Sequence, residues 1–316
     1  MKILMTALLM SALLAGCSGS SKKSEGAQSA QDDVISPEIQ QEFGWIENSD
    51  FVEEQTMNYN PAEDKFDGSL GSADSLSQES IARLPAPKIE DAIDSNDIVT
   101  KLAGLCHARK FTEAFQVIQK VHRKFRKHPA FWNQVGTCHL GKRDYRSAIL
   151  FYNKSRELDS KYAPPLNNLG VIYQTRGSIQ KAYLAYREAS KLNPLSLTPI
   201  FNLAQLQLFG GQVEDALIAF QALVKRNDDD NDALAGFATA LLIRGDTEQA
   251  VRVYDRLSNE AKQNPSYGTN FALAQKLSGD ENGARSTITK IASTPDQSLI
   301  AYYNKVKSFV FQGSNQ

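Results

Sequence analysis

Cysteine and histidine are the residues of this chain whose types could support covalent, redox or metal chemistry. The 316-residue chain contains Cys17, Cys106, Cys138, His107, His122, His128 and His139. The histidines do not have the spacing of a zinc site, and the sequence has no phosphate-binding loop and no nucleophile elbow. The sequence therefore predicts no metal, no cofactor and no catalytic residue, and the chain is not expected to be an enzyme.

Cys17 lies where a different chemistry is expected. Met1 and Lys2 give a short positive start, and residues 3–14 are almost wholly apolar. This run is too short for a permanent membrane-spanning helix and has the length of the apolar part of a secretion signal. One interpretation is an ordinary cleaved signal followed by an incidental cysteine.

The sequence Leu14-Ala15-Gly16-Cys17 also resembles the lipobox of bacterial lipoproteins. The resemblance implies cleavage before Cys17, a diacylglycerol on its thiol and an acyl chain such as palmitate on its new amine, which together give stable membrane attachment. In that family, Ser rather than Asp at residue 18 implies sorting to the outer membrane, with the protein facing the periplasm. We therefore expect residues 1–16 to be a signal peptide and Cys17 to be the lipidation site.

Charge is distributed unevenly along the chain. Residues 18–94 contain 17 acidic and 5 basic residues, whereas residues 95–316 contain 19 acidic and 29 basic residues. The first part has few aliphatic residues, so it cannot bury enough apolar surface to offset its chain entropy. We expect residues 17–94 to be a lipidated, acidic, disordered tether. Residues 36–46 within it either dock as a short helix or stay without structure.

Alanine recurs every 34 residues in the second part of the chain, at Ala114, Ala148, Ala182, Ala216, Ala250 and Ala284. A large apolar residue follows each alanine by four positions, and glycine marks a turn at Gly177, Gly211, Gly245 and Gly279. A period of 34 residues is that of the tetratricopeptide repeat (TPR), a pair of antiparallel helices. Small side chains in such a column let the two helices approach closely.

Residues 163–196 resemble the TPR pattern most clearly, through Leu166, Leu169, Gly170, Tyr173, Gly177, Ala182, Tyr186, Ala189 and Pro194. The resemblance implies an all-α solenoid, a right-handed superhelix of roughly thirteen helices. The six expected repeats are residues 95–128, 129–162, 163–196, 197–230, 231–264 and 265–298. Residues 299–316 are expected to supply a capping helix and a tail.

The family's concave surface binds extended peptides, and its lining positions imply a groove for a protein or peptide partner. The implied groove residues are Asn133, Thr137, Asn167, Val171, Gln174, Phe201, Gln205, Leu208, Thr239 and Leu242. The family's clamp for chaperone tails requires Lys and Arg at groove positions that hold Asn, Thr and Phe here, so this class of partner is disfavoured.

Basic residues gather in the first repeat, at Lys101, Arg109, Lys110, Lys120, Arg123, Lys124, Arg126 and Lys127. One explanation is ordinary, because cations near a helix C-terminus are favourable and solvated. The other is an acidic partner: a protein surface, an anionic wall polymer, lipid headgroups or the chain's own tether. Nucleic acid is not expected in the periplasm.

Cys106 and Cys138 fall in adjacent repeats of a chain expected in an oxidising compartment. They lie at different heights of their helices, and neighbouring helices lie about 8–10 Å apart, which is beyond easy reach of a disulfide. The sequence therefore favours two free thiols.

The combination of anchor, six repeats and no catalytic residues is similar to the TPR lipoproteins that assist secretin rings of type IV pili or that belong to tight-adherence pilus systems. The resemblance implies a scaffold that assists assembly of an envelope complex. The alternative is an adaptor that recruits peptidoglycan hydrolases or synthases to the cell wall, which the long tether and the basic first repeat favour.

Overall fold

The computed structural model describes residues 86–291 and 299–312, and every regular element in these ranges is a helix. The all-α prediction is confirmed. The chain divides into two compact units between residues 200 and 201. The expected signal peptide, Cys17, the segment 36–46 and all of the tether before residue 86 lie outside the described residues.

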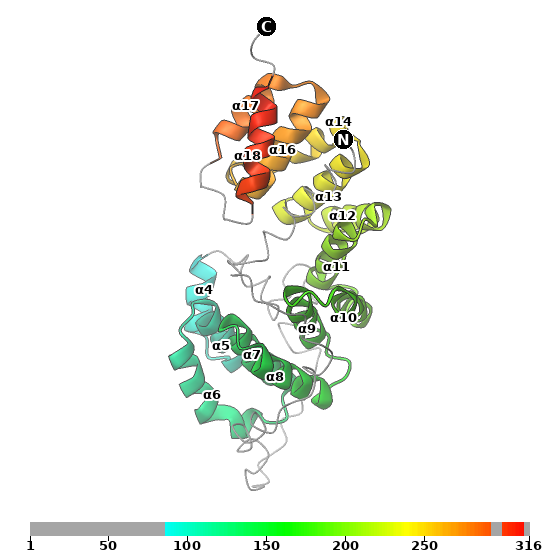
Figure 1. Ribbon diagram of the computed structural model, residues 1–316. Coiled ribbons are helices and arrows are strands. Elements are labelled where there is room, and N and C mark those ends of the chain that lie inside the picture. The colour runs from blue at the N-terminus through cyan, green and yellow to red at the C-terminus, as the bar shows by residue number, and fades with distance from the viewer. Residues whose placement is uncertain (1–85, 292–298, 313–316) are drawn as a thin grey trace. The chain divides into compact units, whose positions relative to one another are not determined.

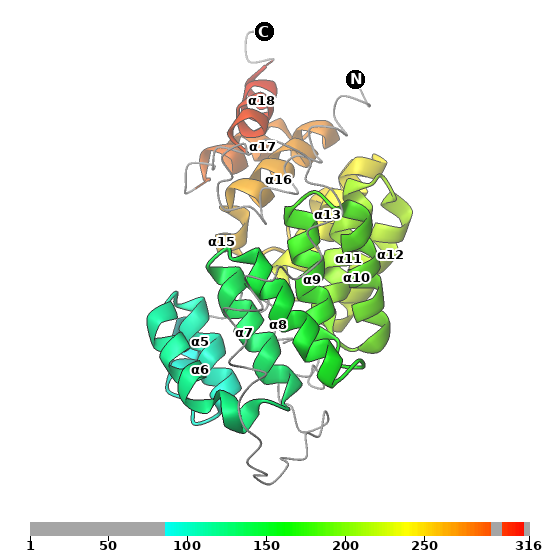
Figure 2. The same ribbon diagram turned by 60° about the horizontal axis from the view of Figure 1, so that its bottom comes forward.

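The N-terminal unit is built from antiparallel helix pairs preceded by one short helix (Figure 1). Within a pair the two helices run side by side, as α5 with α6 and α7 with α8 in Figure 2. The helices are α4 (Ala86–Ile93), α5 (Ile98–His107), α6 (Phe111–Phe125), α7 (Pro129–Gly141), α8 (Tyr145–Leu158), α9 (Pro164–Thr175) and α10 (Ile179–Leu192).

The C-terminal unit repeats the arrangement, and helix α11 contains the boundary between the two units. Its helices are α11 (Leu197–Phe209), α12 (Val213–Arg226), α13 (Asn231–Arg244), α14 (Thr247–Tyr254), α15 (Asn259–Lys262), α16 (Pro265–Ser278), α17 (Glu281–Thr289) and α18 (Ile300–Phe311). One helix pair thus falls in each of the six expected repeat segments. The fifth repeat differs, because its second helix is short and the four-residue α15 follows it.

Small residues set the distance between paired helices. The six alanines at 34-residue intervals are all completely buried. On the facing helix, a Cβ atom added at Gly136 would lie 2.7 Å from the ring of Tyr152, and one added at Gly170 would lie 2.5 Å from the ring of Tyr186. The aromatic ring of one helix therefore occupies the space that a side chain on its partner would need.

The turns inside the helix pairs use left-handed backbone. Gly177, Gly211, Gly245 and Gly279 have φ between 77° and 102°, a conformation that glycine adopts without strain. In the first two repeats Arg109 and Arg143 take the same conformation, with φ of 59° and 63°. The hydrogen bonds that surround the turn hold these two arginines there, as from the Lys110 amide to the carbonyl of Leu105 at 2.8 Å.

The helical part of the chain begins earlier than expected. Residues 86–93, which the sequence places in the disordered tether, form α4, and α4 packs against α5. Gly104 makes this approach possible, because a Cβ there would lie 2.8 Å from the backbone nitrogen of Ile93. The acidic composition of residues 18–94 concealed this short helix, whose Ile93 reaches the core of the first two repeats.

At the other end α18 covers the last repeat, as the capping prediction requires. Tyr302, Val306 and Val310 are buried against α16 and α17, while Lys305 and Lys307 are exposed. Such a cap keeps the apolar face of the final repeat from water.

Candidate binding surfaces

The ten predicted groove residues all lie on first helices of helix pairs. Five belong to the N-terminal unit, on α7 and α9, and five to the C-terminal unit, on α11 and α13. The structure therefore presents them as two separate sets. Asn133, Thr137, Asn167, Phe201, Leu208, Thr239 and Leu242 are buried, whereas Val171, Gln174 and Gln205 are partly exposed.

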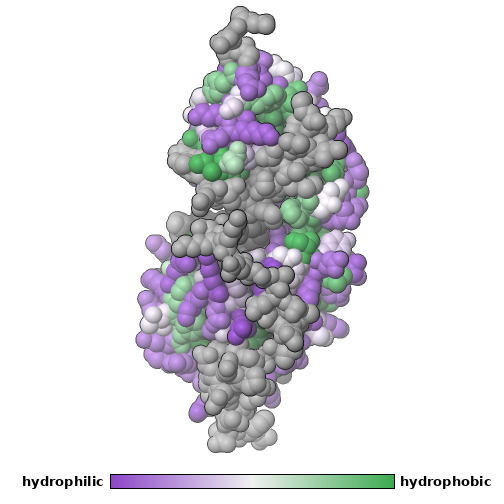
Figure 3. Space-filling view, in the orientation of Figure 1, coloured by the Kyte–Doolittle hydropathy of each residue, from purple (hydrophilic) through white to green (hydrophobic). Residues whose placement is uncertain are grey.

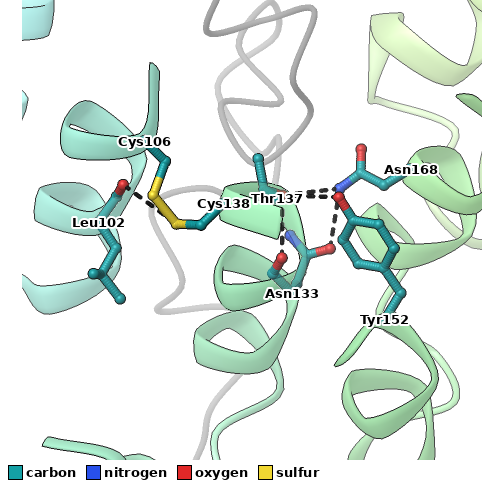
Figure 4. The surroundings of a disulfide bond; sticks show 7 residues. All are labelled: Leu102, Cys106, Asn133, Thr137, Cys138, Tyr152 and Asn168. Atoms are coloured by element: carbon teal, nitrogen blue, oxygen red, sulfur yellow. Dashed lines mark hydrogen bonds between the residues drawn. A yellow bond between two sulfur atoms is a disulfide. The ribbon is translucent and has the colours of Figure 1, made fainter. Parts of the chain in front are cut away.

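In the N-terminal unit, Thr137 belongs to a buried hydrogen-bond network between repeats. Its Oγ1 lies 3.2 Å from the hydroxyl of Tyr152, and the Nδ2 of Asn168 donates to the Oδ1 of Asn133 over 3.1 Å. Figure 4 shows Thr137, Tyr152 and Asn168 pointing toward one another from three helices. Burial raises the pKa of Tyr152, and the hydrogen bond with Thr137 offsets this only in part. The Nδ2 of Asn168 also donates to Thr137 Oγ1 over 3.5 Å, so that Thr137 ties its own repeat to the next one.

The C-terminal unit contains the same network at the same spacing. Thr239 Oγ1 lies 2.7 Å from the Tyr254 hydroxyl, fifteen residues later, and the Nδ2 of Asn270 reaches Thr239 over 3.4 Å. The hydroxyl of Tyr302 donates to the Oδ1 of Asn270 over 2.6 Å, so that α18 joins the network. The groove assignment of Thr137 and Thr239 stays a prediction, but their hydroxyls are also structural.

Sequence reasoning missed Asn168 and Asn270 of these networks. They occupy one column of the repeat with Asn202, at multiples of 34 residues, and all three are buried. A buried polar side chain needs hydrogen-bond partners, so a column of asparagine in the repeat was a signal that could have found them.

Two amide side chains on α7 are buried without a hydrogen-bond partner in the described part of the chain. These are the Nδ2 of Asn133 and both polar atoms of the Gln134 amide. Leaving such an atom unsatisfied costs about 1–3 kcal/mol.

The predicted basic patch forms part of the surface of the first helix pair. Arg109, Lys110, Lys120, Arg123, Lys124 and Lys127 are exposed, while Lys101 and Arg126 are partly buried. Apart from Arg126, none of the eight forms an ion pair with a described residue. In Figure 3 hydrophilic residues (purple) gather along the outer edge of the region where Figure 1 places α4 to α6. The first repeat therefore presents an uncompensated positive surface.

Cys106 and Cys138 form a disulfide, so the prediction of two free thiols is wrong. Their Cα atoms are 5.0 Å apart, and the bond joins α5 to α7 (Figure 4). The two positions differ by 32 residues rather than by one full repeat. Helices α5 and α7 pack closely enough for the bond to form in spite of this offset. Both cysteines are buried, and the carbonyl of Leu102 lies beside the bond. An average distance between helix axes did not capture this local approach.

His139 is a packing residue. Its buried ring lies between the rings of Phe115 and Phe151, at centroid distances of 4.9 and 5.1 Å. Its Nδ1 lies 3.0 Å from Asp144 Oδ2. Burial disfavours ionisation of Asp144, but hydrogen bonds from Ser147 and His139 outweigh it and lower the pKa of this carboxyl.

Within residues 86–291 and 299–312, no three His, Cys, Asp or Glu residues group as metal ligands, and none of the helices there has the length and apolar character to cross a membrane.

Comparison with known proteins agrees with the repeat pattern. Residues 163–194 and residues 201–265 each match a family model of the tetratricopeptide repeat. No curated protein matches the chain. Two segments of the chain are therefore tetratricopeptide repeats by sequence.

Solved structures of low sequence identity share the fold. A structure of PilF from Pseudomonas aeruginosa is 18% identical, with 70% of this chain and 99% of that chain covered and a TM-score of 0.58. A chain of the Cut9–Hcn1 hetero-tetramer of APC/C is 16% identical, with 73% of this chain and 46% of that chain covered and a TM-score of 0.56. At this identity the similarity concerns the fold alone, and the fold is that of a TPR solenoid.

Proposed function

We propose that the chain is a non-enzymatic protein–protein interaction scaffold, held at the outer membrane by lipids on Cys17 and facing the periplasm, which assists assembly of an envelope complex such as a pilus or secretin. The observation that carries the scaffold function is the series of TPR helix pairs, since this fold is typically a non-enzymatic scaffold that binds protein or peptide partners. The partly exposed groove residues Val171, Gln174 and Gln205 favour a partner that offers both apolar and polar groups.

The disulfide supports the proposed location independently of the lipobox. Disulfides persist in exported proteins and are rare where glutathione and thioredoxin keep thiols reduced. A bond between Cys106 and Cys138 is what a domain folded in the periplasm would contain.

A second candidate function is that of an adaptor for peptidoglycan hydrolases or synthases. The observation that favours it is the uncompensated positive surface of the first repeat, which suits an anionic wall polymer. The two functions share the scaffold and differ in the partner.

The anchor is tested by metabolic labelling with radioactive palmitate. The native chain is expected to incorporate label and to fractionate with the outer membrane, whereas Cys17→Ala is expected to lose both. Label incorporation by Cys17→Ala, or an unlabelled native chain, would disprove lipidation at this residue.

The partner is tested by crosslinking the full chain in intact envelopes and identifying the captured proteins. Capture of secretin or pilus subunits supports the first function, and capture of wall enzymes supports the second. The double variant Val171→Ala and Gln205→Ala, at partly exposed groove positions, is expected to reduce capture, while Asn304→Ala, at an exposed position on α18, is the control. Normal secretin multimers in a strain lacking the gene would exclude the pilus role.

A further inference from the structure

Four basic side chains form one stripe along α6 and the turn that follows it. They are Lys120, Arg123, Lys124 and Lys127, and all four are exposed. Residues three, four and seven positions apart lie on the same face of a helix. Lys120, Arg123 and Lys124 therefore lie on one face of α6, and Lys127 follows two residues after the helix ends.

Several cations on other helices are balanced locally, unlike those of the stripe. Lys154, Lys191 and Arg285 each have an acidic partner three or four residues away on the same helix. No acidic residue of the described ranges pairs with any member of the stripe, and Glu113, in the first turn, is the acid that α6 contains. The charge of the stripe is thus not balanced within the repeat.

The helix dipole explains only part of the stripe. Arg123 and Lys124 lie in the last turn, where a cation is favourable. Lys120 precedes that turn, however, and Lys127 follows the end of the helix. Like charges at these spacings repel one another, so such a stripe is stabilised by counter-charge from another part of the chain or from a partner.

The same chain supplies this counter-charge in its N-terminal part. Residues 24–82 contain 14 acidic residues and a single basic one, Lys65. This segment joins α4, which packs on α5, the other helix of the pair that contains the stripe. Asp67 lies 19 positions before Ala86, and at about 3.3 Å per residue this length can span up to about 60 Å. The stripe lies on a helix only about 22 Å long, so it is within reach.

We propose that an acidic part of residues 24–82 occupies the stripe in the free protein, so that another polyanion reaches the stripe only by displacing it. A covalently attached segment has a high effective concentration at a nearby site, in the millimolar range for short connections. Weak charge–charge contacts therefore suffice for occupancy, and an external polyanion must outcompete them. The inference does not depend on which envelope complex the scaffold serves.

The test uses the full mature chain with Cys17→Ser, and a fluorescent synthetic peptide of residues 47–67 as the probe. In a second chain all 14 acidic residues of segment 24–82 are replaced by their amides, Asp by Asn and Glu by Gln, which removes the cis acidic charges. At low salt the peptide is expected to bind the second chain at least about tenfold more tightly than the first, because the cis segment no longer competes. Equal affinities for the two chains would overturn the proposal.

A further variant identifies the surface. Adding Lys120→Gln, Arg123→Gln, Lys124→Gln and Lys127→Gln to the second chain is expected to abolish peptide binding with an unchanged circular dichroism spectrum. The matched control replaces Lys290, Lys305 and Lys307, which are exposed in the last repeat and in α18, by Gln. Equal losses in the stripe and control variants would overturn the proposal. Anionic vesicles that bind equally to the first chain, with its native acidic residues, and to the second chain would also overturn the proposal. This result would assign the stripe to a membrane.

Discussion

At the residue scale, three buried tyrosines join neighbouring helices: Tyr152 and Tyr254 join the two helices of their own repeats, and Tyr302 joins the cap α18 to the last repeat. Tyr152 contacts Thr137, Tyr254 contacts Thr239, and Tyr302 contacts Asn270 through its hydroxyl. Burial raises the pKa of each hydroxyl well above its ordinary value, and for Tyr302 the charge of Tyr254 adds to the effect. Each network therefore depends on a tyrosine that stays protonated.

These tyrosines predict a loss of stability in alkaline solution. In the unfolded chain a tyrosine loses its proton near pH 10, whereas in the folded chain it keeps the proton to higher pH. The stabilisation is complete below about pH 10 and decreases as the pH rises from there toward the raised folded pKa values. Urea unfolding at pH 8, 9, 10 and 11 is expected to show this decrease, and Tyr254→Phe is expected to make it shallower. A constant free energy of unfolding up to pH 11 would contradict the assignment.

Gly170 is the residue at which close helix packing is most directly tested. Gly170→Ala places a methyl group against the buried ring of Tyr186, which cannot turn aside, and overpacking of this kind costs about 1–3 kcal/mol. Gly210→Ala is the matched control, since a Cβ there has only ordinary contacts of 3.4 Å and longer. Chemical denaturation measures the free energy of unfolding of both variants. Equal stabilities would show that the ring of Tyr186 does not limit the space at residue 170.

At the element scale, the disulfide fixes α5 to α7 and thus the first repeat to the second. Reduction is expected to destabilise this unit, because the bond closes a loop of about 31 residues, for which chain entropy predicts about 3–4 kcal/mol. Thermal unfolding with and without dithiothreitol measures the effect. The control is the double variant Cys106→Ser and Cys138→Ser, which is expected to unfold at the same temperature with and without the reductant. If the reductant does not change the unfolding temperature of the native chain, the bond contributes nothing to its stability.

The helix pairs could be predicted from the sequence because their determinants repeat. A column of alanine at residues 114 to 284, the turn glycines and the last apolar segment locate the pairs and the cap without any knowledge of tertiary contacts. Helix α4 could not be predicted in this way, because it lies outside the repeat and its place depends on close packing against Gly104 of the next helix. The disulfide and the networks around Thr137 and Thr239 likewise depend on the exact offset between helices, which a repeat pattern does not specify.

At the scale of the whole molecule, the net charge of −1 is a poor guide to behaviour. The described repeats present an unbalanced cationic stripe, and most of the acidic excess lies in residues that precede α4. The 34-residue repeat pattern predicted which helices contain the groove residues, and the local excess of Lys and Arg predicted the basic patch. The partner could not be predicted, because its identity depends on chemical groups of the partner itself.

The disulfide has a further consequence if the scaffold is pulled between a membrane anchor and a partner. Tension that enters through α5 would pass from Cys106 to Cys138 directly, so that α6 and most of α7 carry no load. The 32-residue separation stores about 115 Å of chain, at about 3.6 Å per residue, that force alone cannot extract. In single-molecule pulling the oxidised protein is expected to be shorter by this length at full extension than the reduced one. The bond would thus act as a mechanical limiter that only a reductant releases.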